Sequence, residues 1–170
     1  MNINNLLDLL DDWRHLPAYQ LERRADIFFA LYLDKIIKHQ TGVAIDYIIP
    51  EFPVRVGEIS EKHSKINQSF KIDYLAFAKK EERVFLIELK TDQRSRRDKQ
   101  DWYLQRAAEI GVDGILQGLQ KINKATNQKK KYKYLLGKIE QMGWITQTAK
   151  SFEINPTNTI PEIIYIQPRN

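Results

Sequence analysis

The sequence predicts an α/β (α+β) fold in which helices flank one β-sheet. Apolar residues recur at three- and four-residue spacing in residues 18–40 and again in residues 98–142, as they do on the buried side of a helix. Four other stretches are rich in β-branched and aromatic residues, which favour strands. These stretches are residues 43–56, 69–78, 83–91 and 162–167. With 170 residues, of which 42% are hydrophobic, the chain suits one core, so we expect a single domain over residues 1–170.

The composition excludes several kinds of site and favours an acidic partner. The chain has no cysteine, so disulfide frameworks and thiolate zinc sites are excluded, and a reducing cytoplasm suits it. No apolar run approaches the roughly 20 residues that span a bilayer, so we expect a cytoplasmic protein with no membrane partner. The net charge of +5 favours an acidic partner, for which nucleic acid is the commonest candidate.

The longest predicted helix covers residues 18–40 and ends near Gly42, because glycine commonly follows the last turn of a helix. Its expected core-facing stripe consists of Ala25, Phe28, Phe29, Tyr32 and Ile36. Glu22 lies two helical turns before Phe29, so we expect its carboxylate at the end of this stripe. The other predicted helices cover residues 6–13, 98–110, 112–122 and 132–142.

The second and third strand-like stretches predict a β-hairpin with a polar tip. If the turn is symmetric about the bond between Lys80 and Glu81, facing residues have numbers that sum to 161, and Asp73 faces Glu88. The same face also carries Lys71, Leu75, Phe77, Val84, Leu86 and Lys90. The opposite face of the hairpin is uniformly apolar, so we expect helices to cover both faces.

Two carboxylates that face each other across a ladder have Cβ atoms about 5 Å apart and repel each other. At ~4 Å between charges the repulsion is ~1 kcal/mol in water and ~4 kcal/mol at the effective dielectric of a protein surface. A divalent cation offsets it best, although a shared proton or the ammonium group of Lys71 or Lys90 would also offset it. Mg²⁺ takes one or two protein carboxylates together with water and substrate phosphates, which matches this pair. Lys90 lies two residues after Glu88 and so projects from the same face, where it could orient an attacking water.

Asp73, followed by Glu88-Leu89-Lys90 at the end of an apolar strand, resembles the PD-(D/E)XK nuclease superfamily. The order of predicted elements is similar too, and the resemblance covers most of the chain. It implies a restriction-endonuclease-like αβββαβ core with a mixed central sheet flanked by helices. It also implies a metal-dependent phosphodiesterase, a deoxyribonuclease, that uses Mg²⁺ or Mn²⁺. Ile72 stands where the superfamily's name has proline, and the segment from Gln100 to Tyr103 is only loosely similar to the Gln-and-Tyr helix of RecB-like members.

The resemblance implies roles for individual residues of this chain. Asp73 and Glu88 would be metal ligands, the carbonyl of Leu89 would be a further ligand, and Lys90 would be the catalytic lysine. Glu22 matches the acidic residue that many members supply from the first core helix. The alternative for Glu22 is an ordinary ion pair with a basic neighbour at the edge of its helix.

A basic segment follows the predicted catalytic lysine and contains two aromatic residues. Its basic residues are Arg94, Arg96, Arg97, Lys99 and Arg106. Together with Trp102 and Tyr103, these side chains would line a groove that holds the phosphate backbone of a nucleic acid. The alternative is a solvated loop and helix face with no ligand.

Three functions remain open from the sequence. The first is a divalent-metal-dependent nuclease that acts on DNA, and the second is a catalytically silent nucleic-acid-binding module of the same fold. The third is a protein-interaction module in which the charged end of the hairpin contacts a partner. The retained trio of Asp73, Glu88 and Lys90 favours the first. A single site would cut one strand and a homodimer could cut both, and the sequence leaves the oligomeric state open.

Overall fold

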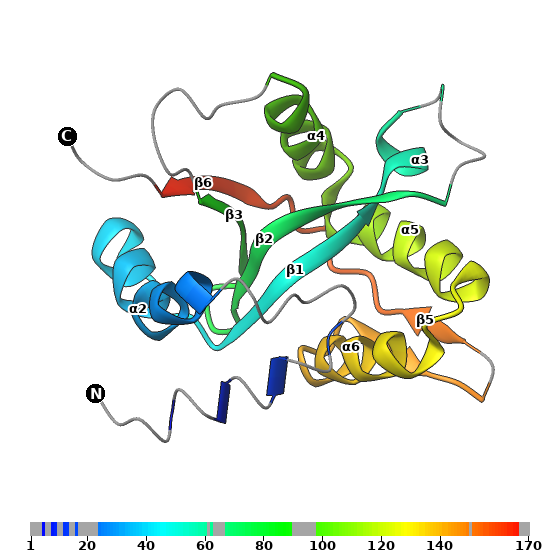
Figure 1. The fold of residues 1–170 in the computed structure, drawn as a ribbon, viewed down its shortest axis with the longest axis horizontal. Helices are drawn as coiled ribbons and strands as arrows, with labels where there is room; N and C mark the ends of the chain where they lie inside the picture. Colours follow the sequence, from blue (N-terminus) through cyan, green and yellow to red (C-terminus); the bar gives the residue numbers. More distant parts are fainter. Residues whose placement is uncertain are drawn as a thin grey trace.

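A computed structural model describes residues 24–60, 62, 67–89, 98–149 and 151–166, together with Asn5, Asp8, Leu9, Asp12, Trp13 and Leu16. At its centre is a four-stranded sheet in the order β1-β2-β3-β6 (Figure 1). The strands are β1 (Tyr47–Arg55), β2 (Ser69–Ala78), β3 (Arg83–Leu89) and β6 (Glu162–Ile166). β1, β2 and β3 pair antiparallel, whereas β6 lies parallel to β3. The sheet is therefore mixed, and all four predicted strands form.

Helices flank this sheet, as the sequence predicts. They are α2 (Arg24–Thr41), α3 (Val56–Ile59), α4 (Asp98–Glu109), α5 (Gly111–Ala125) and α6 (Lys129–Gln141). In Figure 1, α2 lies on one side of the sheet, and α4, α5 and α6 lie on the other. A small antiparallel sheet is formed by β4 (Ile145–Gln147) and β5 (Phe152–Ile154). Neither this sheet nor α3 is predicted from the sequence, because elements of three or four residues are too short to show a period.

The hairpin of β2 and β3 has the register predicted from its turn. Its pairs are Tyr74 with Ile87, Leu75 with Leu86, Ala76 with Phe85, Phe77 with Val84 and Ala78 with Arg83. In every pair the residue numbers sum to 161, as expected for a symmetric turn of four residues. The ladder ends at Tyr74 and Ile87, so Asp73 and Glu88 are the next residue on each strand.

Both faces of the hairpin are buried, which confirms the expectation from its apolar pattern. On one face Tyr74 lies against Trp13, with the ring centroids 6.3 Å apart. On the other face Phe77 lies against Trp144, with the ring centroids 4.9 Å apart. Leu86, at the centre of β3, is completely inaccessible to solvent. Each such large apolar side chain stabilises the fold by about 1.5–3 kcal/mol, so the hairpin is held rigidly from both sides.

Helix α2 ends where the sequence predicts, but its buried stripe differs from the prediction. Gly42 follows the helix with a φ of 75°, and its N–H donates to the carbonyl of Lys38 at 2.9 Å. Leu33 and Ile37 are fully buried, whereas Tyr32 is 42% exposed. The prediction that Tyr32 faces the core is therefore wrong. Leu33 and Ile37 occupy the interior, and Tyr32 lies on a more exposed side of the helix.

Strand β1 lies at the edge of the sheet and is interrupted at Glu51, near its two prolines. The residues on either side keep one register against β2, since Pro50 pairs with Tyr74 and Phe52 pairs with Ile72. Glu51 itself has a φ of 50°, a left-handed conformation that costs residues other than glycine roughly 1–2 kcal/mol. An edge strand tolerates proline, which has no N–H for a ladder, so Pro50 and Pro53 fit the position of β1 in the sheet.

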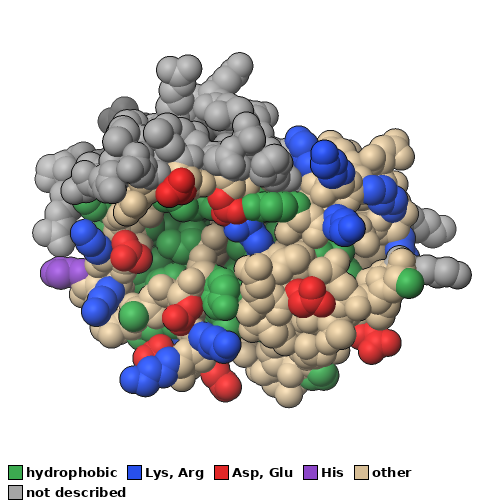
Figure 2. Space-filling model, turned by 90° about the horizontal axis from the view of Figure 1, so that it is seen from below, with side chains coloured by type: hydrophobic (Ala, Val, Ile, Leu, Met, Phe, Trp, Pro, Cys, Tyr) green, Lys and Arg blue, Asp and Glu red, His purple; other side chains and the backbone are tan. Residues whose placement is uncertain are grey.

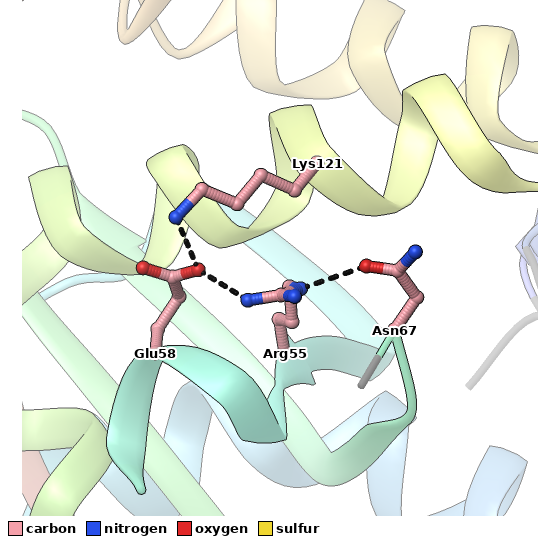
Figure 3. A network of polar contacts seen from close by, with 4 residues as sticks. All are labelled: Arg55, Glu58, Asn67 and Lys121. Carbon is pink, nitrogen blue, oxygen red and sulfur yellow. Dashed lines mark hydrogen bonds and ion pairs between the residues drawn. The ribbon is translucent and has the colours of Figure 1, made fainter. Parts of the chain in front are cut away.

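At the end of β1 a buried polar network joins β1 to α3 and α5 (Figure 3). Arg55, only 5% exposed, donates from Nη1 to Glu58 Oε1 at 2.7 Å and from Nε to Asn67 Oδ1 at 3.0 Å. Lys121 of α5 donates to the same Glu58 oxygen at 2.8 Å. Gly118 of α5 lies against this network, because a Cβ there would lie 2.8 Å from Glu58 Cγ and 3.0 Å from Arg55 Cβ. The close approach of α5 to β1 therefore requires glycine at this position.

An exposed ion pair fastens β6 to the start of β3. Arg83 donates from Nε and Nη2 to the two carboxylate oxygens of Glu162, at 2.7 and 2.8 Å. These hydrogen bonds lower the pKa of Glu162 below its usual value. The pair lies at the opposite end of β3 from Glu88, so it orients the strands without contributing to the charge near that residue.

Charged side chains of both signs are scattered over the face shown in Figure 2. Figure 2 shows one face on which Lys and Arg side chains gather at one end and are interspersed with Asp and Glu over the rest. The net charge of +5 is therefore not spread as one uniform basic surface over this face. No described helix is long and apolar enough to cross a lipid bilayer.

We expect Gly118→Ala to lower the free energy of unfolding by about 1–3 kcal/mol, measured by urea denaturation. The new methyl group would force Glu58 and Arg55 apart and so disturb a buried guanidinium that needs its partners. The change occurs in a helix, where alanine is otherwise the better residue.

Gly137→Ala is the matched control, because Gly137 also lies inside a helix but nothing is within 4 Å of its added Cβ. This substitution should stabilise the protein by up to about 1 kcal/mol through helix propensity alone. Equal stabilisation by both substitutions would show that α5 does not need the close approach at Gly118.

Candidate active site

Asp73 and Glu88 lie on neighbouring strands at the place where the hairpin ladder ends. Side chains alternate along a strand, so both residues project from the same face of the sheet. Asp73 Oδ2 accepts a hydrogen bond of 2.8 Å from the backbone N–H of Leu89. The carboxylate thus serves as the acceptor for a main-chain donor of the next strand and bridges β2 and β3 beyond their last pair. This bond fixes the position of the Asp73 side chain.

Glu88 is buried and held by a helix that follows it in the chain. It is 3% exposed, and its Oε1 accepts a hydrogen bond from Nε2 of Gln100 on α4. A buried carboxylate is costly unless it is hydrogen-bonded or close to a positive charge. The amide of Gln100 supplies such a hydrogen bond and orients the Glu88 carboxylate.

A third carboxylate, that of Glu51, occupies the same level of the sheet on β1. The register between β1 and β2 continues across the interruption, which sets Glu51 opposite Asp73. Glu51 is 8% exposed, and its Oε2 lies 3.3 Å from Nζ of Lys71. Three adjacent strands therefore carry an acidic residue side by side, and the one on β1 has left-handed backbone geometry. Strained backbone of this kind concentrates at functional sites.

The pair of Asp73 and Glu88 suits Mg²⁺ better than it suits a metal that needs an all-protein cage. Among the residues that the structure describes, no three His, Asp or Glu side chains are grouped closely enough to hold a metal ion. Mg²⁺ takes one or two protein carboxylates and fills its other positions with water and substrate phosphates. The number of carboxylates is therefore compatible with the predicted cofactor, and the neighbouring Glu51 forms an ion pair with Lys71.

Several predicted site residues lie outside the described residues. They are Glu22, Lys90, Arg94, Arg96 and Arg97. Residues 18–23 of the first predicted helix are outside them too, as are the side chains of Ala25, Phe28 and Phe29. Their roles therefore remain predictions, as does that of the Leu89 carbonyl as a metal ligand.

Lys99 and Arg106, the other two predicted nucleic-acid-binding residues, line one groove between α3 and α4. The groove has a volume of about 640 Å³. Its lining consists of Ile59, Ser60, Lys62, Lys99, Trp102, Tyr103 and Arg106. Ligand sites in proteins are commonly of roughly 300–1,000 Å³, so the groove is large enough for one. The structure thus brings together the basic and aromatic residues that the sequence singled out on this helix.

Sequence reasoning misses Glu51 and the contact that Gln100 makes. Gln100 enters the sequence analysis only through the loose similarity of residues 100–103 to a Gln-and-Tyr helix, and no local spacing indicates that the first turn of α4 folds back onto Glu88 of β3. For Glu51 a signal exists, because a lone acidic residue between Pro50 and Pro53 in an otherwise apolar strand is unusual. The local charge pattern would have identified it as a candidate.

Comparison with known proteins identifies no similar protein. No protein-family model, no curated protein and no solved structure matches the chain. The resemblance to PD-(D/E)XK nucleases therefore rests on the hairpin residues Asp73 and Glu88-Leu89-Lys90 and on the order of the elements.

We expect Asp73→Asn to leave the metal-free protein at least as stable as the wild type. The amide oxygen can still accept the hydrogen bond from Leu89, and the repulsion between Asp73 and Glu88, on the order of 1 kcal/mol or more, is removed. Asp73→Ala should instead lower the free energy of unfolding by about 1–3 kcal/mol, since the Leu89 N–H loses its acceptor. Urea denaturation in EDTA measures both. Equal destabilisation by the two variants would contradict the role of this hydrogen bond.

We expect Gln100→Ala to weaken the binding of Mn²⁺ by about 10–100-fold, because an orienting partner of a metal ligand typically contributes that much. Titration calorimetry with Mn²⁺ measures the affinity. Gln105→Ala is the matched control, since Gln105 is exposed on the same helix. If the two variants bind Mn²⁺ equally well, Gln100 does not position Glu88.

Proposed function

We propose that the chain is a divalent-metal-dependent nuclease of the PD-(D/E)XK type that hydrolyses phosphodiester bonds of DNA. The observation that carries the proposal is the pair of carboxylates on one face of the hairpin, with Asp73 bonded to Leu89 and Glu88 bonded to Gln100. These hydrogen bonds do not by themselves require two charged side chains. Neutral amide oxygens at both positions could accept them without the repulsion between carboxylates.

The arrangement of elements supports the same family. The order α2, β1, β2, β3, α4 and β6 contains the helix, three strands, helix and strand of a restriction-endonuclease-like core. The strand order β1-β2-β3-β6, with β6 parallel to β3, is compatible with the mixed sheet of that core. α5, α6 and the β4–β5 sheet would then be additions between the second core helix and the last strand.

The residues of the site would act mainly by positioning. A bound Mg²⁺ or Mn²⁺ would supply positive charge that stabilises the negative charge developing on the phosphate. Asp73 and Glu88 would hold the ion, while the hydrogen bonds from Leu89 and Gln100 keep the carboxylates in place. Lys90, two residues after Glu88, would project from the same face, orient the attacking water and counter the charge on the phosphate.

The decisive experiment is cleavage of supercoiled and linear DNA by the purified chain with Mg²⁺, with Mn²⁺ and with EDTA. We expect nicking or degradation that requires the metal. Asp73→Asn, Glu88→Gln and Lys90→Ala should each lower the rate by at least about 100-fold, because each removes a charge that acts on the transition state.

Glu153→Gln serves as the control, because Glu153 is an exposed acidic residue on the small sheet that the site does not use. It should cleave DNA at the wild-type rate. Activity that survives in Asp73→Asn and Glu88→Gln would point to a contaminating nuclease and contradict the proposal. Binding of DNA without any metal-dependent cleavage would leave the catalytically silent module as the better reading.

A further inference from the structure

One tryptophan of this chain is placed differently from the others. Trp13 and Trp144 are 3% and 4% exposed and belong to the core, whereas Trp102 on α4 is 43% exposed. It touches Tyr103 of the same helix, with the ring centroids 5.4 Å apart and the planes inclined by 53°. This tilted contact does not cover an indole face as parallel stacking would. Trp102 therefore presents aromatic surface to the groove between α3 and α4 that it lines.

The same groove is positively charged. Of its described lining residues, Lys62, Lys99 and Arg106 are cationic and none is acidic. Lys99 extends over the ring of Tyr103, with its Nζ 5.6 Å from the ring centroid. Arg106 donates from Nε to the carbonyl of Ile59 at 3.4 Å and pairs with Glu109, so its guanidinium is held at the edge shared by α3 and α4. Beside the aromatic surface, Lys99 is therefore stacked on Tyr103 and Arg106 is held by its hydrogen bond and ion pair.

We infer that this groove binds a single-stranded segment of the nucleic acid, with one base stacked on Trp102 and neighbouring phosphates on Lys99, Lys62 and Arg106. The inference rests on the proposed nuclease function, because it describes how the same protein would take up the strand that it cuts. Cations beside an exposed aromatic ring match the phosphate and the flat base of one nucleotide at the same time. In a duplex both faces of each base are already stacked, so only an unpaired base can use Trp102.

Helix α4 connects this groove to the candidate active site. Lys99, Trp102 and Arg106 are separated by three and four residues and so lie along one side of α4. Gln100, which bonds to Glu88, lies on an adjacent side of the helix, rotated by about 100° from Lys99. A strand in the groove therefore runs beside the turn of α4 that contacts Glu88. The groove can deliver the strand to the site without any movement of the helix.

The experiment measures binding without cleavage, by keeping the full chain in EDTA. A labelled oligothymidine, which cannot pair with itself, is compared with a duplex of the same length by fluorescence anisotropy. Intrinsic tryptophan fluorescence is followed in the same titration. Because Trp13 and Trp144 are buried, quenching by a stacked base reports on Trp102.

We expect the single strand to bind more tightly than the duplex and to quench the tryptophan fluorescence. Trp102→Ala should weaken single-strand binding by roughly 5- to 100-fold, the effect of losing one stacked base. Trp102→Phe should retain most of the affinity while losing the quenching. Tyr32→Ala is the matched control, because Tyr32 is an aromatic residue of similar exposure on α2, and it should bind like the wild type.

Two results would overturn the inference. One is equal affinity for duplex and single strand with no effect of Trp102→Ala, and the other is no binding of the oligonucleotide. Failure of the proposed function gives a different pattern: single-strand binding that depends on Trp102, together with no metal-dependent cleavage. Conversely, metal-dependent cleavage of DNA together with either of those two binding results would uphold the nuclease and refute the single-strand groove.

Discussion

The hydrogen bond from the backbone N–H of Leu89 to the carboxylate of Asp73 determines the geometry of the site. A main-chain donor that is partly shielded from water needs an acceptor, and here the side chain of the neighbouring strand supplies it where the regular ladder has ended. The bond fixes the aspartate and keeps β2 and β3 together. It also leaves Glu88, one residue before Leu89, on the same face as Asp73. The backbone of the hairpin thus sets the distance between the two carboxylates, and burial on both faces keeps that backbone rigid.

The electrostatics at this level of the sheet work against stability. Glu51, Asp73 and Glu88 occupy three adjacent strands, and two of them are almost inaccessible to solvent. The backbone at Glu51 adds a conformational cost of its own. Lys71 offsets part of the charge at Glu51, and Gln100 orients the Glu88 carboxylate. The divalent cation that we propose would offset the repulsion between the carboxylates further.

Some features of the candidate site could be predicted from the sequence, and others could not. The pair of Asp73 and Glu88 could be predicted because a symmetric turn and the two-residue alternation of strands together fix the register. Tyr32 was misassigned because aromatic and aliphatic residues alternate closely along α2, and spacing alone does not show which ones the core takes. The contact of Gln100 with Glu88 depends on how α4 packs against β3. Such tertiary packing cannot be read from the local sequence pattern. The left-handed backbone at Glu51 has no periodic signal at all, since it is imposed by the surrounding strand.

Two sides of helix α4 make different contacts. The side that carries Gln100 also carries Leu104 and Ala107, which are buried, so core packing holds the orienting amide against Glu88. The side that carries Lys99, Trp102 and Arg106 faces the groove. Because a helix is rigid over twelve residues, the position of a strand in the groove and the position of the carboxylates are set by the same packing. Under the function that we propose, a substitution in the buried stripe of α4 would therefore disturb strand binding and metal binding together. Changes on its exposed side would separate the two.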